Sequence, residues 1–113
     1  MVPGEIYIAK FPFGDVAGMK LRPVLLLTSS VGSVPEILVA YISSVIPAQL
    51  LPSDLVVDPM RAEFQNSHLK VISAVRLHKL ATIHCSSLAR RLGHLEPAHR
   101  TLIATKLKAF LGF

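Results

Sequence analysis

The chain opens with alternating apolar and polar residues and continues with short apolar runs, a pattern typical of β-strands. Glu5–Phe11 alternates, is rich in Ile, Tyr and Phe, and ends at a proline. Pro23–Thr28 is a continuous apolar run, which indicates a strand buried on both faces. Further strands are predicted over Ile37–Val45, Asp54–Asp58 and Val71–Ile83, the last of them bent or bulged near Lys79.

The segments between these strands differ in how clearly they can be interpreted. Phe13–Leu21 has two glycines and no periodicity, so we expect a flexible loop that joins two strands. Ser29–Pro35 is rich in serine and contains a glycine, which predicts a turn. Pro59–Ser67 has no clear period and fits either a helical turn or a loop.

Two helices are predicted after the strands. Ser86 is a plausible N-cap and Gly93 a plausible C-terminal stop, which favours a short helix over about 86–92. Pro97 suits the first position of a longer helix over about 97–111. The apolar face of that helix is predicted to hold Ile103, Leu107, Phe110 and Leu111.

This order of elements predicts one mainly β domain over residues 1–113. Strands followed by a single closing helix favour a small antiparallel β-barrel or curled sheet, over about 3–83, rather than alternating strands and helices.

The composition is basic and unusually apolar for so short a chain. Its 113 residues include 12 Lys and Arg against 7 Asp and Glu, a net charge of +5, and 51% are hydrophobic. Such a chain must bury a core, which excludes the disordered class. Because a domain of this size buries only about two-thirds of the surface of its unfolded chain, we expect a partner to cover some of the apolar surplus.

Charge is divided unevenly along the chain. Residues 1–58 hold three Lys or Arg against five Asp or Glu, a net −2, whereas residues 59–113 hold nine against two, a net +7. All five histidines lie in the second half. A polyanionic partner such as nucleic acid, or an acidic protein segment, would explain this distribution. An ordinary solvated basic surface explains it equally well.

No membrane span or secretion signal is expected. The longest uncharged stretch, Ile37–Ser53, contains two prolines and several polar residues, so it cannot form the roughly 20-residue apolar helix that a bilayer requires. The first residues lack a secretory signal pattern, and the lone Cys85 fits a reducing compartment. We therefore expect a cytoplasmic protein.

The arginine next to Pro23 is the strongest candidate for a functional residue. Pro23 holds Arg22 in extended geometry at the exit of the glycine-containing loop, close to Lys20. A guanidinium with a fixed direction suits a phosphate group. A surface salt bridge with Asp15 is the alternative explanation.

Two hydroxyls interrupt the third predicted strand. Ser43 and Ser44 face opposite sides of the strand, so one of them can face a site. A strand end that turns toward Pro47 is the alternative. On a later strand, Arg76 and His78 share a face by alternation, and His78 titrates in the range useful for proton transfer.

Familiar cofactor and metal motifs are absent from the sequence. It contains no phosphate-binding glycine loop, no dinucleotide fingerprint, no CxxC and no His pair at metal spacing on a helix. We therefore predict neither a cofactor nor a metal.

Several of these segments together resemble the PemK/MazF toxins of type II toxin–antitoxin modules. Their order carries the resemblance: a glycine-containing loop, an Arg-Pro strand start, a Ser/Thr strand end and an Arg-Leu-x-Lys-Leu strand. The segments are Pro3–Ile8, Phe11–Asp15, Gly18–Leu27, Ala40–Ser43 and Val75–Ile83. Two positions depart from the family pattern, since Ser43 stands where Thr is usual and His68 where Gly is more frequent.

The resemblance implies an SH3-like barrel with a C-terminal helix, and a homodimer silenced by a cognate antitoxin. It also implies a metal-independent endoribonuclease that cuts single-stranded RNA, with Arg22 and Ser43 as catalytic residues. Lys20, Ser44, Arg76 and His78 are the candidate substrate-binding residues, with His78 as a candidate proton carrier.

Two other functions remain open at this point. One is a toxin on the same scaffold that binds and inhibits a DNA topoisomerase, as the related CcdB branch does. The other is a plain nucleic-acid-binding barrel. The 6% aromatic content and the absence of Trp count against a surface on which bases stack.

Overall fold

The structure is a computed structural model that describes residues 1–11 and 20–113. Its described part holds β-strands, two short 3₁₀ helices (η1 and η2) and one α-helix. In chain order they are β1 (Glu5–Phe11), β2 (Lys20–Leu26), β3 (Glu36–Ser43), β4 (Asp54–Val57), η1 (Ala62–Ser67), β5 (Ser73–His84), η2 (Cys85–Ser87), β6 (Leu88–His94) and α1 (Pro97–Leu111). The loop expected over Phe13–Leu21 lies mostly outside the described residues, as does Asp15, and β2 already begins at Lys20.

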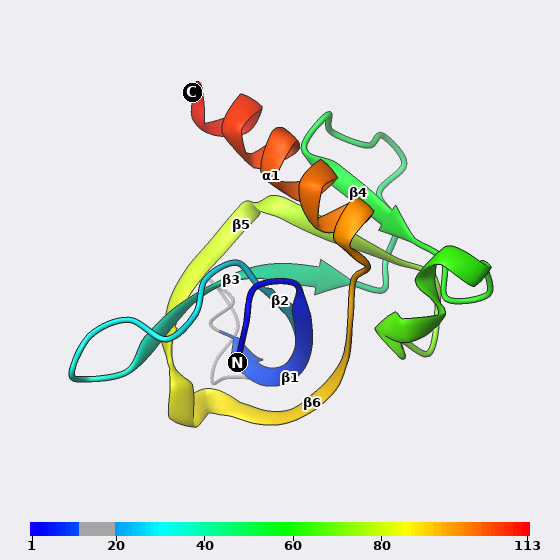
Figure 1. The fold of residues 1–113 in the computed structure, drawn as a ribbon. Helices are drawn as coiled ribbons and strands as arrows, with labels where there is room; N and C mark the ends of the chain where they lie inside the picture. The colour runs from blue at the N-terminus through cyan, green and yellow to red at the C-terminus, as the bar shows by residue number, and fades with distance from the viewer. Residues whose placement is uncertain (12–19) are drawn as a thin grey trace.

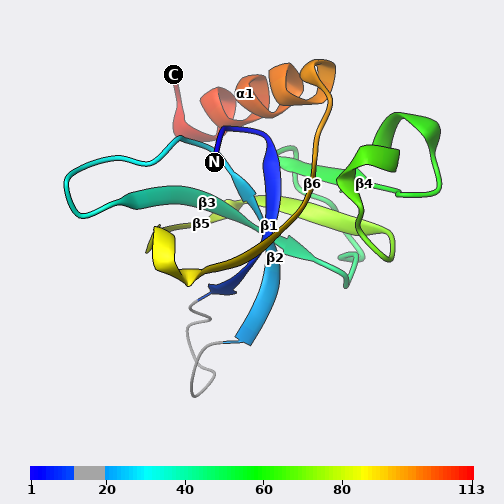
Figure 2. The same ribbon diagram turned by 60° about the horizontal axis from the view of Figure 1, so that its bottom comes forward.

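The strands form a curled antiparallel sheet in the order β4-β5-β3-β2-β1-β6. Figures 1 and 2 show the sheet curling round on itself, with α1 lying over one end of the curl. The expected small antiparallel barrel with a C-terminal helix is confirmed. The curl is a half-barrel, with β4 and β6 as its two edges.

A bulge bends the longest strand. Ala40 of β3 pairs with Leu80 of β5, but the next residue, Tyr41, pairs with Arg76, so Leu77–Lys79 are extra residues on β5. This confirms the bend expected near Lys79. A bulge increases local twist, and it allows one 12-residue strand to pair with β3 along its length and with β4 at its start.

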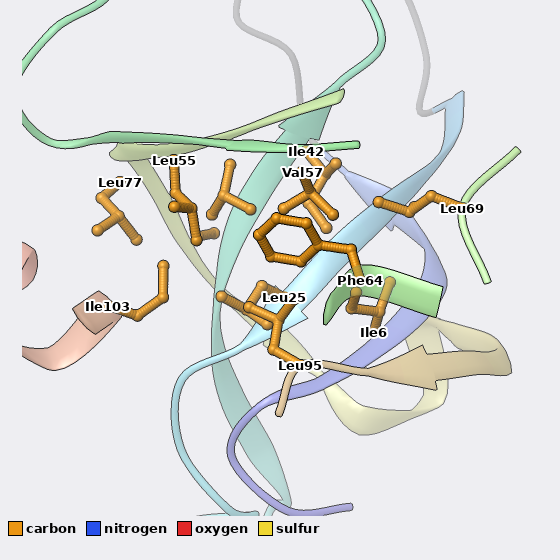
Figure 3. Packing of buried hydrophobic residues seen from close by; sticks show 12 residues of the cluster. Ile6, Leu25, Ile42, Leu55, Val57, Phe64, Leu69, Leu77, Leu95 and Ile103 are labelled. Atoms are coloured by element: carbon orange, nitrogen blue, oxygen red, sulfur yellow. The ribbon is translucent and has the colours of Figure 1, made fainter. Parts of the chain in front are cut away.

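Apolar side chains fill both faces of the central strands. Val24, Leu25 and Leu26 of β2 are each 1% exposed or less, which confirms the strand buried on both faces. Figure 3 shows Phe64 of η1 in the middle of the main cluster, with Ile103 of α1 entering from the side. The unperiodic segment 59–67 therefore contributes a 3₁₀ helix that supplies a core residue.

The helix expected over 86–92 is wrong. Only Cys85–Ser87 makes a single 3₁₀ turn, and Leu88–His94 is strand β6, so the sheet extends beyond the boundary expected near residue 83. β6 pairs with the outer edge of β1, where it satisfies backbone groups that would otherwise lie unpaired. This tertiary pairing outweighs the local Ser and Gly signals, which have only modest weight.

The C-terminal helix begins and ends where the sequence predicts. Pro97 occupies the first turn, and Gly112 ends α1 in the left-handed region with φ of 82°. The predicted apolar face is only partly covered, however. Ile103 is buried and Leu107 is half-buried, whereas Phe110 and Leu111 are 48% and 50% exposed. The described chain leaves the last turn of this face open to solvent.

Candidate functional site

One polar cavity of about 370 Å³ lies where β2 and β3 separate, bordered by β6 and by the segment after η1. We call it the site pocket. Its polar lining comes from four parts of the chain. The described polar residues that line it are Arg22, Tyr41, Ser43, Ser44, His68, Lys70, Ser73 and Arg90.

Strand register brings Arg22 and Ser43 to this pocket. The last recorded β2–β3 pair at this end is Val24 with Tyr41. Two residues further along the same antiparallel register, Arg22 stands opposite Ser43. Pro23 lies between and has no N–H to donate to the ladder, which explains why the hydrogen-bonded pairing stops there. The pocket occupies the opening that results, and Arg22 and Ser43, the catalytic pair that the resemblance implies, both line it.

The two serines at the end of β3 have different environments. Ser43 is 7% exposed, and its Oγ donates to the carbonyl of Val45 and accepts from the Val45 N–H, both at 3.1 Å. These bonds hold the hydroxyl at the pocket wall. Ser44 is exposed just beyond the strand end, and it lines the same pocket. Ser43 is therefore the more rigidly placed of the two hydroxyls, and Ser44 is the more exposed.

Two further cations, which the sequence analysis did not single out, also line the pocket. Arg90 stands on β6 opposite Ile8 of β1, and Lys70 follows η1. Arg90 was missed because its segment was interpreted as a helix. With Arg22, these residues place three positive charges around one cavity, an arrangement that favours a phosphate-bearing ligand.

His68 is the third functional candidate that sequence reasoning did not assign to the site. It lines the pocket and adopts φ of 54°, and it is the one non-glycine residue with positive φ among those described. Left-handed geometry favours glycine, and the resemblance described above implies glycine at this position. That departure from the family pattern was the available signal.

The remaining predicted residues lie elsewhere. Lys20 is exposed at the start of β2, and neither Lys20, Arg76 nor His78 is among the described residues that line the pocket. Arg76 donates through Nε to Oδ1 of Asp54 at 2.8 Å. Contact of these three residues with a substrate stays a prediction.

His78 has an unusual environment for a histidine. Its Nδ1 is buried without a hydrogen-bond partner among the described residues. Burial lowers the pKa of His78, and the neighbouring Arg76 lowers it further, while Asp54 opposes the change. The imidazole is therefore held toward its neutral form.

The described residues contain no group of three or more His, Cys, Asp or Glu side chains placed to hold a metal ion. No helix in residues 1–11 and 20–113 is long and apolar enough to cross a membrane.

Comparison with known proteins gives a family match over almost the whole chain. Residues 2–111 match the family described as PemK-like, MazF-like toxin of type II toxin–antitoxin system. No curated protein matches the chain.

Solved structures share the fold. The Mycobacterium tuberculosis toxin MazF-mt6 has a TM-score of 0.74 at 24% identity, over 96% of this chain and 97% of its own. An endoribonuclease in complex with its cognate antitoxin, from a mycobacterial species, has a TM-score of 0.70 at 16% identity, over 100% of this chain and 96% of its own. MazF from Deinococcus radiodurans has a TM-score of 0.66 at 16% identity, over 99% and 96%. At these identities the likeness establishes the fold.

Proposed function

Because the chain belongs to the PemK-like, MazF-like toxins of type II toxin–antitoxin systems, we propose that it is an endoribonuclease that cuts single-stranded RNA. The observation that carries the proposal is the site pocket, which Arg22 and Ser43 both line and where Lys70 and Arg90 add positive charge. The mycobacterial endoribonuclease of similar fold supports the same activity.

The proposed reaction is attack of the ribose 2′-hydroxyl on the adjacent phosphate. A bond forms between the 2′-oxygen and phosphorus, and the bond from phosphorus to the 5′-oxygen breaks. Negative charge builds on the phosphate oxygens in the transition state. The Arg22 guanidinium stabilises that charge, and the Ser43 hydroxyl turns from the Val45 carbonyl to donate a second hydrogen bond. Neither Arg22 nor Ser43 accepts a proton readily at neutral pH.

We expect the pocket cations to hold the RNA backbone on either side of the cut. Lys70 and Arg90 are exposed, so their ammonium and guanidinium groups can reach phosphates without a large desolvation cost. A single strand fits better than a duplex, because only flexible RNA can align its 2′-oxygen with the bond that breaks.

Two protein partners are proposed as well, a second copy of the chain and a cognate antitoxin. The exposed apolar residues at the end of α1, Phe110 and Leu111, offer surface for one of them. One structural neighbour is in complex with its cognate antitoxin. We expect the protein to act in the cytoplasm, where RNA and antitoxin are both present.

The test is cleavage of a defined single-stranded RNA by purified protein in the presence of a chelator. We expect products that end in a 2′,3′-cyclic phosphate and a 5′-hydroxyl, the signature of 2′-hydroxyl attack. Arg22→Ala should lower the rate by about 10²–10³-fold and leave the fold intact. Arg61→Ala, at an exposed cation paired with Glu63, is the matched control.

Two results would contradict the proposal. One is the absence of RNA cleavage by wild-type protein, in particular if the same protein inhibits DNA supercoiling by a topoisomerase. The other is wild-type cleavage by Arg22→Ala, which would show that the pocket arginine is not part of the reaction.

A further inference from the structure

The reaction proposed above needs a proton acceptor for the 2′-hydroxyl, and the lining of the site pocket offers one candidate. Arg22, Lys70 and Arg90 are cations and cannot accept a proton near neutral pH. The serine and tyrosine side chains among the described lining residues carry hydroxyls, which are poor proton acceptors. His68 is the one imidazole in the described lining, and histidine is the side chain suited to accept a proton near neutral pH.

The backbone at His68 is held in its unfavourable conformation from several sides. The preceding residue, Ser67, is fully buried, and its Oγ accepts from the Leu69 N–H at 3.3 Å. Leu69 is 7% exposed and belongs to the main core cluster. His68 is therefore fixed between two buried neighbours, and its own side chain is left on the pocket side.

Strand β6 packs closely against the same turn and so helps to fix it. A Cβ atom at Gly93 would lie 2.1 Å from the Asn66 carbonyl oxygen and 2.7 Å from that of Ser67. Glycine alone allows the end of η1 to pack so closely on β6. Asn66 also donates through its amide to Glu96 at the start of α1. A left-handed non-glycine residue that the surrounding structure holds so firmly is a common feature of functional sites.

We propose that His68 is the proton acceptor of this ribonuclease, a role that rests on the function proposed above. The proton of the 2′-hydroxyl passes to the unprotonated ring nitrogen of His68 as the 2′-oxygen bonds to phosphorus. The bond to the 5′-oxygen breaks, and that oxygen takes a proton from water. The imidazolium then returns its proton to solvent. The products are a 2′,3′-cyclic phosphate and a 5′-hydroxyl, and no other reactant is consumed.

The experiment compares cleavage of one mapped RNA site by wild type and His68→Asn from pH 5 to 9, under single-turnover conditions. Asparagine tolerates the left-handed backbone but does not accept a proton. We expect the wild-type rate to rise with pH and then level off. His68→Asn should be about 10²–10⁴-fold slower at the plateau and lose the rising limb. Binding of an RNA with a 2′-deoxy residue at the cut should stay within about threefold of wild type.

A second variant keeps the proposal testable if asparagine disturbs the loop. His68→Gly suits the backbone better than the native residue, and added imidazole should restore its cleavage in proportion to the imidazole concentration. His84→Asn, at an exposed histidine that hydrogen-bonds Ser86 and does not line the described pocket, is the matched control. Its rate and pH profile should equal those of wild type.

The outcomes separate this proposal from the proposed function. If wild type cleaves RNA, Arg22→Ala does not, and His68→Asn keeps the wild-type rate or the rising limb, only the role of His68 is overturned. A wild-type rate that falls as pH rises through the imidazole range would also overturn it, since that profile belongs to a proton donor. If wild type cleaves no RNA, the proposed function itself fails.

Discussion

The Nε atom of Arg76 on β5 donates to the Oδ1 atom of Asp54 on β4 at 2.8 Å, and the Asp54 side chain is completely buried. The other carboxylate oxygen, Oδ2, accepts from the Leu51 N–H at 2.8 Å. One carboxylate therefore ties the edge strand to its neighbour and closes the turn that precedes it. Such a pair is costly to break, because either partner left alone is a charge with little access to water.

We expect Asp54→Ala to lower the free energy of unfolding by roughly 3 kcal/mol, since it leaves the Arg76 guanidinium largely buried and unpaired. Urea denaturation measures this change. The control is Glu63→Ala, which breaks the exposed Arg61–Glu63 pair and should cost about 0.5 kcal/mol or less. Similar losses in the two variants would contradict a structural role for the Asp54 carboxylate.

Replacement of Ser43 tests the second catalytic group. Ser43→Ala should reduce RNA cleavage by about 10²-fold, because the transition state loses a hydrogen-bond donor. It should also cost about 1 kcal/mol of stability, since the Val45 N–H and carbonyl lose their partner. Ser43→Thr keeps the hydroxyl and should keep most of the activity. The assignment fails if alanine cleaves as fast as threonine.

The pocket cations are expected to set the salt dependence of RNA binding. Arg90→Gln or Lys70→Gln should weaken binding of a non-cleavable RNA. Each should also reduce the slope of log affinity against log salt by about 0.7, the value for one phosphate contact on a single strand. Lys108→Gln on α1, outside the described pocket lining, is the control. An unchanged slope in both pocket variants would remove these residues from the RNA contact.

His78 predicts a pH dependence of stability. Its pKa in the folded protein lies below the ordinary value of 6.5, first because of burial and then because of Arg76. Between the two values the unfolded chain binds more protons than the folded one, so the free energy of unfolding should fall as pH drops below about 6.5 and level off below the folded pKa. Urea denaturation from pH 7.5 to 5 should show this loss.

His78→Gln removes the titrating group, so the decrease between pH 7.5 and 5 should be smaller than in wild type whatever the variant's absolute stability. The exposed His84 provides the comparison, and His84→Gln should retain the wild-type decrease. Equal decreases in wild type and His78→Gln would show that the burial of His78 does not affect folding. Glu5 adds a separate loss below pH 4.5, because hydrogen bonds from Arg91 and Val2 outweigh its burial and lower its pKa.

Local sequence signals placed most of the framework. The alternation of apolar and polar residues predicted both ends of β1. Pro97 and the glycine after the helix mark the two ends of α1. These features are encoded within a few residues of the chain, so no knowledge of tertiary contacts is needed to recognise them. Pro23 also marked Arg22, and the end of an apolar strand marked Ser43 and Ser44, whereas the choice of Ser43 came from the family resemblance.

Other features depend on segments that lie far apart in the chain. Leu88–His94 carries helix-like end signals, yet it forms β6 because β1 has a free edge to pair with. That pairing brings Arg90 to the pocket, and the absent side chain of Gly93 lets the η1 turn pack closely enough to hold His68 there. Phe110 likewise stays 48% exposed, although it falls on the apolar face that the periodicity of the helix predicts.

The sequence by itself determined a mainly β chain closed by one helix, and it marked the arginine before a proline and the serines after an apolar strand, because propensity, periodicity and proline geometry act over short distances. The tertiary structure decided which edge strand completes the sheet, which cations surround the pocket, and that a histidine in left-handed geometry faces it. Those outcomes follow from pairing and close packing between segments distant in the chain, and residue order does not reveal them locally.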